Sequence, residues 1–359
     1  MVSTSPLKES KVIFMKHQTL FRLFVILLLL VVSIAVQAQD DVLTSVLVDE
    51  SPVLDGIADD AAWETAMPIV IEVRRGANVE ESIVTLKSVY TEDMVYFLVM
   101  WDDPTQSFLR FPWEMQDDGT WIQLSDPDNM GGDDNIWYED KFAFIWEINE
   151  IQYFADEGCF AACHLTEDEE DYESGKPYGN KFTENEDGLG DIWHWKSVRN
   201  VGQLHDQYLD GTRWSEDTGS AGRHSDPSDE GGYSNNINEE GTAPEFMAMG
   251  DAYGKDGSPG RIMLEDAVPF DASLFEAGDR VPGIIVSPFV GDGGDISGGW
   301  MWDDGVWTLE VGRALVTESE FDVQFDDMTA DYLFGIAPFD NAQVRHMFHR
   351  GALHFGFGG

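Results

Sequence analysis

Basic side chains are scarce in this sequence. Its 359 residues include 21 lysines and arginines against 68 aspartates and glutamates, a net charge of −47. The first 38 residues hold four of the basic residues and one of the acidic ones, so the remainder carries 17 against 67, or −50. Such a chain repels phosphate backbones and anionic membrane surfaces, which makes nucleic acid and such membranes poor partners.

The acidic residues cluster in stretches such as 167–171 and 187–191. We interpret them as a solvated face suited to salty surroundings, where ions screen the mutual repulsion. Calcium ligation is the alternative, because carboxylates are the oxygen ligands that Ca²⁺ prefers.

Long apolar runs are also missing after the first 38 residues. The one apolar run, 23–36, is preceded by Lys16 and Arg22 and followed by Val36-Gln37-Ala38. This pattern predicts a signal peptide over 1–38 that is cleaved near Ala38, with Met15 as an alternative start. The run is short for a membrane span. We therefore expect an exported, periplasmic protein with no membrane span in the mature chain.

Familiar catalytic patterns are absent as well. The sequence shows no Ser-His-Asp order, no glycine-rich phosphate loop and no HExxH zinc motif. We therefore expect no catalysis by this chain on its own.

Helical periodicity is missing nearly everywhere, and strand-like alternation takes its place. Between residues 83 and 101, two alternating segments flank a turn at 91–93, which predicts a hairpin. Further strands are expected in the first part of 42–60, before Pro52, and at 69–73, 141–148, 192–198, 283–289, 306–313, 321–325, 333–338 and 353–357. The pattern is typical of a mainly β fold, an immunoglobulin-like or DOMON-type β-sandwich with long acidic loops. We expect one domain over 39–359, with a loop-rich insertion at about 204–258.

The two cysteines of the chain lie together in Cys159-x-x-x-Cys163-His164. Covalent haem attachment normally uses C-x-x-C-H, so this run carries one extra residue. Two thiols add to the two vinyl groups of the porphyrin, and the adjacent imidazole supplies an axial ligand to iron. The motif therefore predicts one haem c, bound through Cys159 and Cys163, with His164 on the iron.

Two other interpretations of the motif stay open at this point. An even number of cysteines in an exported protein is typical of a disulfide, although Cβ atoms at i and i+4 of a regular helix lie about 5–6 Å apart and a disulfide needs about 3.5–4.5 Å. A partial zinc site is the other interpretation, but no obvious fourth ligand accompanies the three residues.

Four segments resemble a known family when they are taken in order. They are 54–63, 100–105, 191–196 and 302–313, the last reading Trp-Asp-Asp-Gly-Val-Trp-Thr-Leu-Glu-Val-Gly-Arg. Together they resemble the haem-binding domain of the ethylbenzene dehydrogenase gamma-subunit type, a β-sandwich related to family 9 carbohydrate-binding modules. The resemblance spans most of the chain after residue 38, with the acidic loops outside it.

The resemblance implies an electron-transfer module. Better-known members hold a non-covalent b-type haem between a methionine and a lysine, and they partner molybdopterin and iron–sulfur subunits of the dimethyl sulfoxide reductase type in the periplasm. This sequence departs from that pattern, since Cys159, Cys163 and His164 lie where the methionine-bearing loop is expected. We therefore interpret it as a c-type variant.

A second axial ligand is expected from a histidine, methionine or lysine. His346 is the first candidate, because it precedes the last strand, and Met301, between two tryptophans, is the second. His205 and His224 fall in the loop-rich stretch and are disfavoured. A second group of pocket candidates consists of Trp193, His194 and Lys196, and the haem propionates have Arg199 and Arg313 as candidate partners.

Three function classes compete, and the third, an acidic calcium-dependent surface protein with one disulfide, gives no reason for His164 beside the second cysteine. The first is a periplasmic c-type cytochrome module that passes electrons between a redox enzyme and a carrier. The alternative is an exported carbohydrate-binding sandwich with a Cys159–Cys163 disulfide, in which surface tryptophans stack on sugar rings. The alternative predicts an exposed aromatic cleft and gives no reason for His164 beside the second cysteine.

Overall fold

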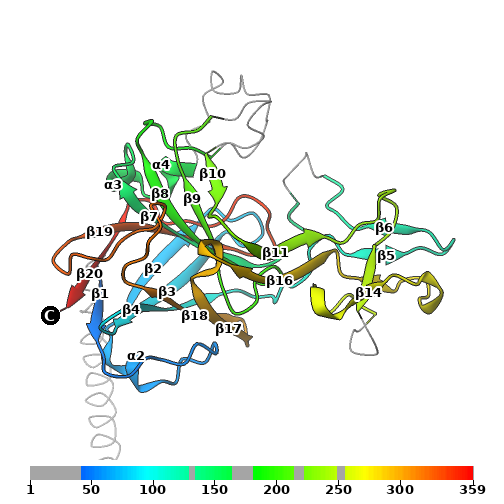
Figure 1. Ribbon diagram of the computed structural model, residues 1–359, viewed down its shortest axis with the longest axis horizontal. Helices are drawn as coiled ribbons and strands as arrows, with labels where there is room; N and C mark the ends of the chain where they lie inside the picture. The colour runs from blue at the N-terminus through cyan, green and yellow to red at the C-terminus, as the bar shows by residue number, and fades with distance from the viewer. Residues whose placement is uncertain (1–41, 129–133, 164–180, 214–221, 249–254, 359) are drawn as a thin grey trace, which may run out of the picture. The chain divides into compact units, whose positions relative to one another are not determined.

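β-Strands carry almost all the regular structure in the residues that the computed structural model describes, which are 42–128, 134–163, 181–213, 222–248 and 255–358 (Figure 1). The predicted signal peptide over 1–38 lies outside these residues. Residues 41–359 form one compact unit. Among the described helices, none has the length and apolar character needed to cross a bilayer.

One large sheet forms the body of the protein, and its first half contains the predicted hairpin. Val84 of the first hairpin strand lies opposite Trp101 of the second, and Leu86 opposite Val99, so alternate side chains share one apolar face. The strands of this half are β1 (Val42–Leu47), β2 (Ile69–Arg74), β3 (Glu81–Tyr90), β4 (Met94–Asp102), β17 (Ser297–Asp303) and β18 (Val306–Ala314).

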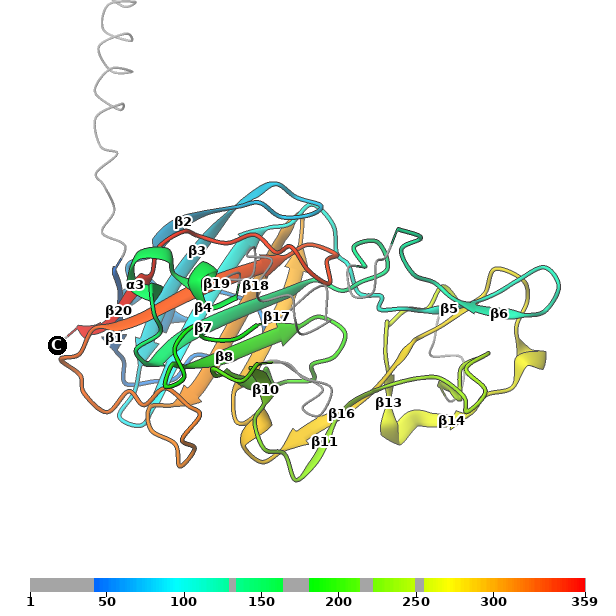
Figure 2. The same cartoon turned by 90° about the horizontal axis from the view of Figure 1, so that it is seen from above.

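The second half of the same sheet runs in the order β10-β9-β8-β7-β19-β20 and joins the first half where β20 pairs with β1 in parallel. Its strands are β7 (Lys141–Asn149), β8 (Leu189–Lys196), β9 (His205–Leu209), β10 (Arg223–Ser225), β19 (Tyr332–Phe339) and β20 (Leu353–Gly358). Figure 2 shows β19, β7 and β8 side by side.

The two halves face each other across an aromatic core. Phe97 of β4 lies 5.7 Å from Phe144 and 5.5 Å from Trp146 of β7, measured between ring centroids, and 5.6 Å from Trp193 of β8. A backbone bridge between Gln203 and Ser297 connects the far ends of the two halves. The predicted mainly β sandwich is therefore confirmed, and one curved sheet supplies both layers.

Smaller sheets lie beyond the edge of the sandwich (Figure 2). Trp113 anchors one of them, because its indole N–H donates a hydrogen bond of 2.7 Å to the Asn236 carbonyl. These sheets consist of β5 (Trp113–Met115), β6 (Trp121–Gln123) and β15 (Arg280–Val281); β11 (Glu230–Asn235), β13 (Ile262–Met263) and β16 (Ile284–Val290); and β12 (Phe246–Ala248) with β14 (Ala267–Pro269).

Two local expectations need correction. The stretch 204–258 holds β9 to β12, and β9 is part of the main sheet with His205 and Asp206 buried, so its first part is not a loop. The predicted strand over 321–325 is an irregular segment. In both cases the tertiary contacts of buried side chains decide the backbone conformation, and the local sequence pattern does not.

Helical structure is limited to short segments in the described residues. Trp63 on the first of them is buried as expected, and its indole N–H donates to Glu310 Oε1 at 2.7 Å. The α-helices are α2 (Ala61–Thr65), α3 (Phe154–Glu157) and α4 (Cys159–Cys163), and the 3₁₀-helices are η2 (Leu264–Asp266), η3 (Ala272–Leu274) and η4 (Asp292–Gly294).

Candidate functional site

A cavity lies on the outer face of β7, β8 and β19, on the side away from the aromatic core. Strand alternation explains its walls, since Phe142 and Trp146 enter the core whereas Ala143 and Ile145 face outward. The cavity holds about 440 Å³ of empty space, part of it open to solvent. It is lined by Ala143, Phe144, Ile145, Cys159, Lys181, Ile192, His194, Arg223, Gly335, Ile336, Ala337, Phe339 and His346.

Cys159 reaches this cavity because helix α4 packs tightly on β19. Its side chain is 3% exposed, and its Sγ lies 3.9 Å from the Ile336 carbonyl oxygen. Gly335 allows the approach, since a Cβ at that position would lie 2.9 Å from the Cys159 Cβ. Helix α4 ends at Cys163; the side chain of Cys163, together with His164, lies outside the part of the chain that the structure describes.

His194 presents an unused nitrogen at the cavity wall. Its Nδ1 lies 3.0 Å from Gln207 Oε1, whereas its buried Nε2 has no hydrogen-bond partner. Because an amide oxygen only accepts hydrogen bonds, Nδ1 carries the proton and the lone pair is on Nε2. Burial lowers the pKa of His194 well below its ordinary value, and nearby Lys196 adds to the effect, so the ring is neutral. A neutral imidazole with its far nitrogen held in this way is arranged like a metal ligand.

His346 lines the same cavity from the connection between β19 and β20. It is 8% exposed, its Nδ1 lies 2.9 Å from the Met347 carbonyl oxygen, and its ring packs 4.7 Å from that of Phe339. Phe339 also stacks against His194 at 5.9 Å between ring centroids. Two predicted pocket histidines and Cys159 therefore meet around one cavity, although they are far apart in the sequence.

Other predicted site residues lie elsewhere. Trp193 points into the aromatic core, as strand alternation with His194 requires, and it does not line this cavity. Met301 is 41% exposed on β17, paired with Thr308, and it does not line the cavity.

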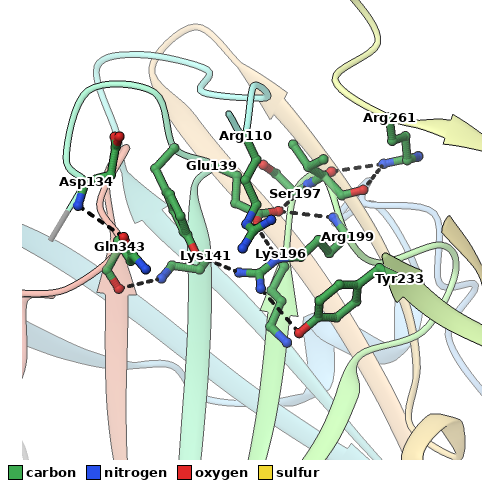
Figure 3. A network of polar contacts seen from close by, with 12 residues as sticks. Arg110, Asp134, Glu139, Lys141, Lys196, Ser197, Arg199, Tyr233, Arg261 and Gln343 are labelled. Carbon is green, nitrogen blue, oxygen red and sulfur yellow. Dashed lines mark hydrogen bonds and ion pairs between the residues drawn. The ribbon is translucent and has the colours of Figure 1, made fainter. Parts of the chain in front are cut away.

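Lys196 follows His194 on the same outward face, at the end of the strand, where its amine already has a hydrogen-bond partner. Its Nζ lies 2.5 Å from His205 Nδ1, and burial lowers the pKa of Lys196 well below its ordinary value. Lys141 lies opposite Lys196 in the register and donates a hydrogen bond of 3.1 Å to the Gln343 carbonyl. The network around them is drawn in Figure 3.

A buried ion pair closes this end of the outer face (Figure 3). Arg199 pairs with Glu139, and Arg110 approaches the same carboxylate at 3.9 Å. Burial would raise the pKa of Glu139, but Arg199 and then Arg110 hold it below its ordinary value. Arg199 also donates to the hydroxyls of Tyr138 and Tyr233, each at 3.3 Å.

The two arginines predicted to meet haem propionates are thus committed to other partners. Arg199 belongs to the Glu139 pair, and Arg313 is fully buried among aspartates outside the cavity. The cations that do line the cavity are Lys181 and Arg223, neither of which was among the predicted site residues. No local pattern distinguishes them, since each reaches the cavity only through the fold.

Comparison with known proteins supplies two findings. The sequence pattern that defines the ethylbenzene dehydrogenase family matches residues 60–351. No curated protein sequence gives a significant match.

Solved structures with a similar chain path include a family 9 carbohydrate-binding module from Caldicellulosiruptor kristjanssonii. Its complex with glucose is 9% identical, with a TM-score of 0.33 over 89% of this chain and 95% of that one. Its complex with cellotriose is 8% identical, with a TM-score of 0.31 over 89% and 94%. These scores are too low to support a conclusion about function.

Proposed function

This chain belongs to the ethylbenzene dehydrogenase family, and from that premise we propose that it is a haem-binding electron-transfer subunit of an oxidoreductase. The observation that carries the proposal is the convergence of Cys159, His194 and His346 on one cavity. When bound, the haem supplies reversible one-electron chemistry at its iron.

The residues around the cavity fit a haem by their chemistry. Ala143 and Ala337 are small side chains on the sheet side of the cavity, and most of its remaining lining is aliphatic or aromatic, as a haem pocket requires. Lys181 and Arg223 are suited to pair with carboxylates, as propionates require. We assign covalent attachment to Cys159 and Cys163 and one axial bond to His164.

For the second axial ligand we favour His194. Its neutral ring has an unpartnered Nε2 at the cavity wall, whereas Lys196 is already bonded to His205. His346 is the second candidate, since it lines the same cavity.

The finer part of the proposal concerns location and partners. We propose export to the periplasm after cleavage near Ala38, and assembly with molybdopterin and iron–sulfur subunits of the dimethyl sulfoxide reductase type. The support is family membership together with the predicted signal peptide. Purification of the tagged chain from its native host tests the assembly, because molybdenum should co-purify with it in fixed ratio.

The first experiment is a visible spectrum of the exported protein, oxidised and then reduced, with haem staining after denaturing electrophoresis. We expect a sharp reduced α-band and a stain that survives denaturation. Cys159→Ser should weaken or abolish the stain. A colourless protein from cells that attach haem c efficiently would refute the proposal.

Ligand variants separate the axial assignment from haem attachment. His194→Gln should keep the stain but convert the low-spin spectrum to a high-spin one. Met301→Leu and His354→Gln serve as controls, because Met301 does not line the cavity and His354 is an exposed partner of Asp331. A spectrum that changes with His346→Gln and not with His194→Gln would reassign the ligand to His346.

The carbohydrate-binding alternative predicts a different result. Every tryptophan within the described residues is buried or half-buried, which leaves no exposed indole platform in that part of the chain. Calorimetric titration with glucose and with cellotriose tests the alternative directly. Binding of either sugar by a colourless protein would favour it.

A further inference from the structure

Five aspartates from separate segments of the chain gather near Arg313, away from the cavity. Two come from neighbouring strands of one half of the sandwich, and three come from connections between strands. They are Asp191 on β8, Asp206 on β9, Asp226 after β10, Asp295 after η4 and Asp322 between β18 and β19. We call these five residues the aspartate cluster.

One arginine cannot balance this cluster. Arg313 approaches Asp191 at 3.4 Å and Asp322 at 2.9 Å, and all three side chains are buried. Five carboxylates therefore face one guanidinium, which leaves an excess of negative charge in a region of low dielectric. A bound cation, or protonation of some of the carboxyls, is needed to offset it.

The carboxylate oxygens indicate where that cation binds. Asp191, Asp206 and Asp322 are at most 2% exposed, and each has one oxygen in hydrogen bonds and one with no partner. Asp226 is also 2% exposed, and neither of its carboxylate oxygens has a partner. Its backbone N–H donates to the Asp206 carbonyl at 3.2 Å, so its position beside the other three is held by the backbone.

The spacing is compatible with one bound cation. One oxygen each from Asp191, Asp206 and Asp322 lie within 4.8 Å of one another. Calcium binds oxygen at about 2.3–2.6 Å, so two ligands on opposite sides of the ion are about 4.6–5.2 Å apart and adjacent ligands are closer. Calcium is favoured over magnesium because it takes about six to eight oxygen ligands in a flexible geometry, whereas magnesium usually keeps several waters.

We propose that the aspartate cluster is a calcium site, with Asp191, Asp206 and Asp322 as ligands and Asp226 beside them. Asp295 is the exposed member of the cluster. The ion joins β8 and β9 of one half-sheet to the connection after β18 of the other, so binding stabilises the sandwich. The proposal does not depend on haem.

A second acidic group, Asp103, Asp140 and Asp340, does not meet the same conditions. Asp140 Oδ2 accepts hydrogen bonds from the Ser107 backbone N–H and the Trp307 indole, and its Oδ1 accepts from the Asn341 backbone N–H. Asp103 is the member of this group with a buried unpartnered oxygen. The group therefore supplies a matched control variant.

The test is calcium titration of the purified full-length protein after EDTA treatment, followed by calorimetry and by thermal unfolding. We expect one Ca²⁺ per chain with a Kd of about 10⁻⁴ M or tighter, and a higher Tm. Asp226→Asn should weaken binding at least about tenfold without breaking an internal hydrogen bond of its side chain. Asp103→Asn should bind calcium like the wild type.

Several outcomes would overturn the proposal. It fails if about 10 mM CaCl₂ gives neither heat nor a shift in Tm, or if Asp103→Asn loses binding while Asp226→Asn keeps it. Near-UV circular dichroism checks that each variant is folded. If Asp226→Asn does not fold, Asp295→Asn replaces it, because Asp295 is exposed, and an unchanged Kd in a folded Asp295→Asn protein then counts against the site.

Discussion

Single buried side chains set much of the chemistry of this protein. His194 and Lys196 lie two residues apart on one strand face, and burial disfavours the charged form of both. They differ in their partners, since the lysine amine contacts His205 whereas the His194 Nε2 contacts no polar group. The strand pattern predicts that the two residues share a face, but only the neighbouring strand decides which nitrogen is available.

At this scale Asp103 should make stability depend on pH. Burial, followed by the charge of Asp340, raises the pKa of Asp103 to about 7. Between about pH 4 and 7, Asp103 therefore holds a proton in the folded state that it has released in the unfolded state. The free energy of unfolding falls as the pH rises through this range, because the folded state must keep or give up that proton. Asp103→Asn lacks this loss, so its stability relative to the wild type should improve by up to about 1.4 kcal/mol per pH unit in that window.

Urea unfolding of both proteins at pH 5, 6, 7 and 8, with EDTA present, measures this difference. Asp102→Asn, an exposed neighbour, is the control and should follow the wild type. Parallel pH profiles for Asp103→Asn and the wild type would contradict the assignment.

Among the elements, strand β19 and helix α4 depend on each other most directly. Gly335 lies outward on β19, where the helix backbone passes so closely that the Cys159 N would be 3.1 Å from an added Cβ. The close approach brings the first cysteine of the motif to the cavity. A glycine in the middle of a strand is otherwise unfavourable, so its presence here has a packing reason.

Gly335→Ala should therefore destabilise the protein by about 1–3 kcal/mol, because the added methyl group displaces α4. The haem stain should weaken with it, since Cys159 moves. Gly356→Ala on β20 is a matched control, because its added Cβ would meet nothing closer than 3.7 Å, and we expect a neutral or slightly stabilising effect. Urea unfolding and haem staining measure both variants, and equal effects would rule out this role for Gly335.

At the scale of the whole molecule, negative charge is the main unfavourable term. The net charge of −47 acts on the folded state through long-range repulsion, which the compact form concentrates. Added salt shortens the range of this repulsion from about 10 Å at 0.1 M to about 3 Å at 1 M.

We accordingly expect Tm to rise by several degrees between about 0.02 and 1 M NaCl with EDTA present, and most of the rise below about 0.5 M, where the Debye length changes most. Differential scanning calorimetry measures the shift. At pH 4 many carboxylates are protonated, so the same salt series should have a smaller effect there. A Tm that is constant or falls with salt at pH 7 would show that the repulsion is already offset by local pairing.

The sequence by itself determined the class of the fold and the place of the cysteine motif. Period-2 alternation depends on neighbours along one strand, so it predicted the hairpin of β3 and β4. Only the tertiary structure decided which residues meet. His194 and His346 share a cavity because β7 pairs with both β8 and β19, and Arg313 meets Asp191 because the two half-sheets face each other. These contacts join residues far apart in the chain, and no local pattern specifies them.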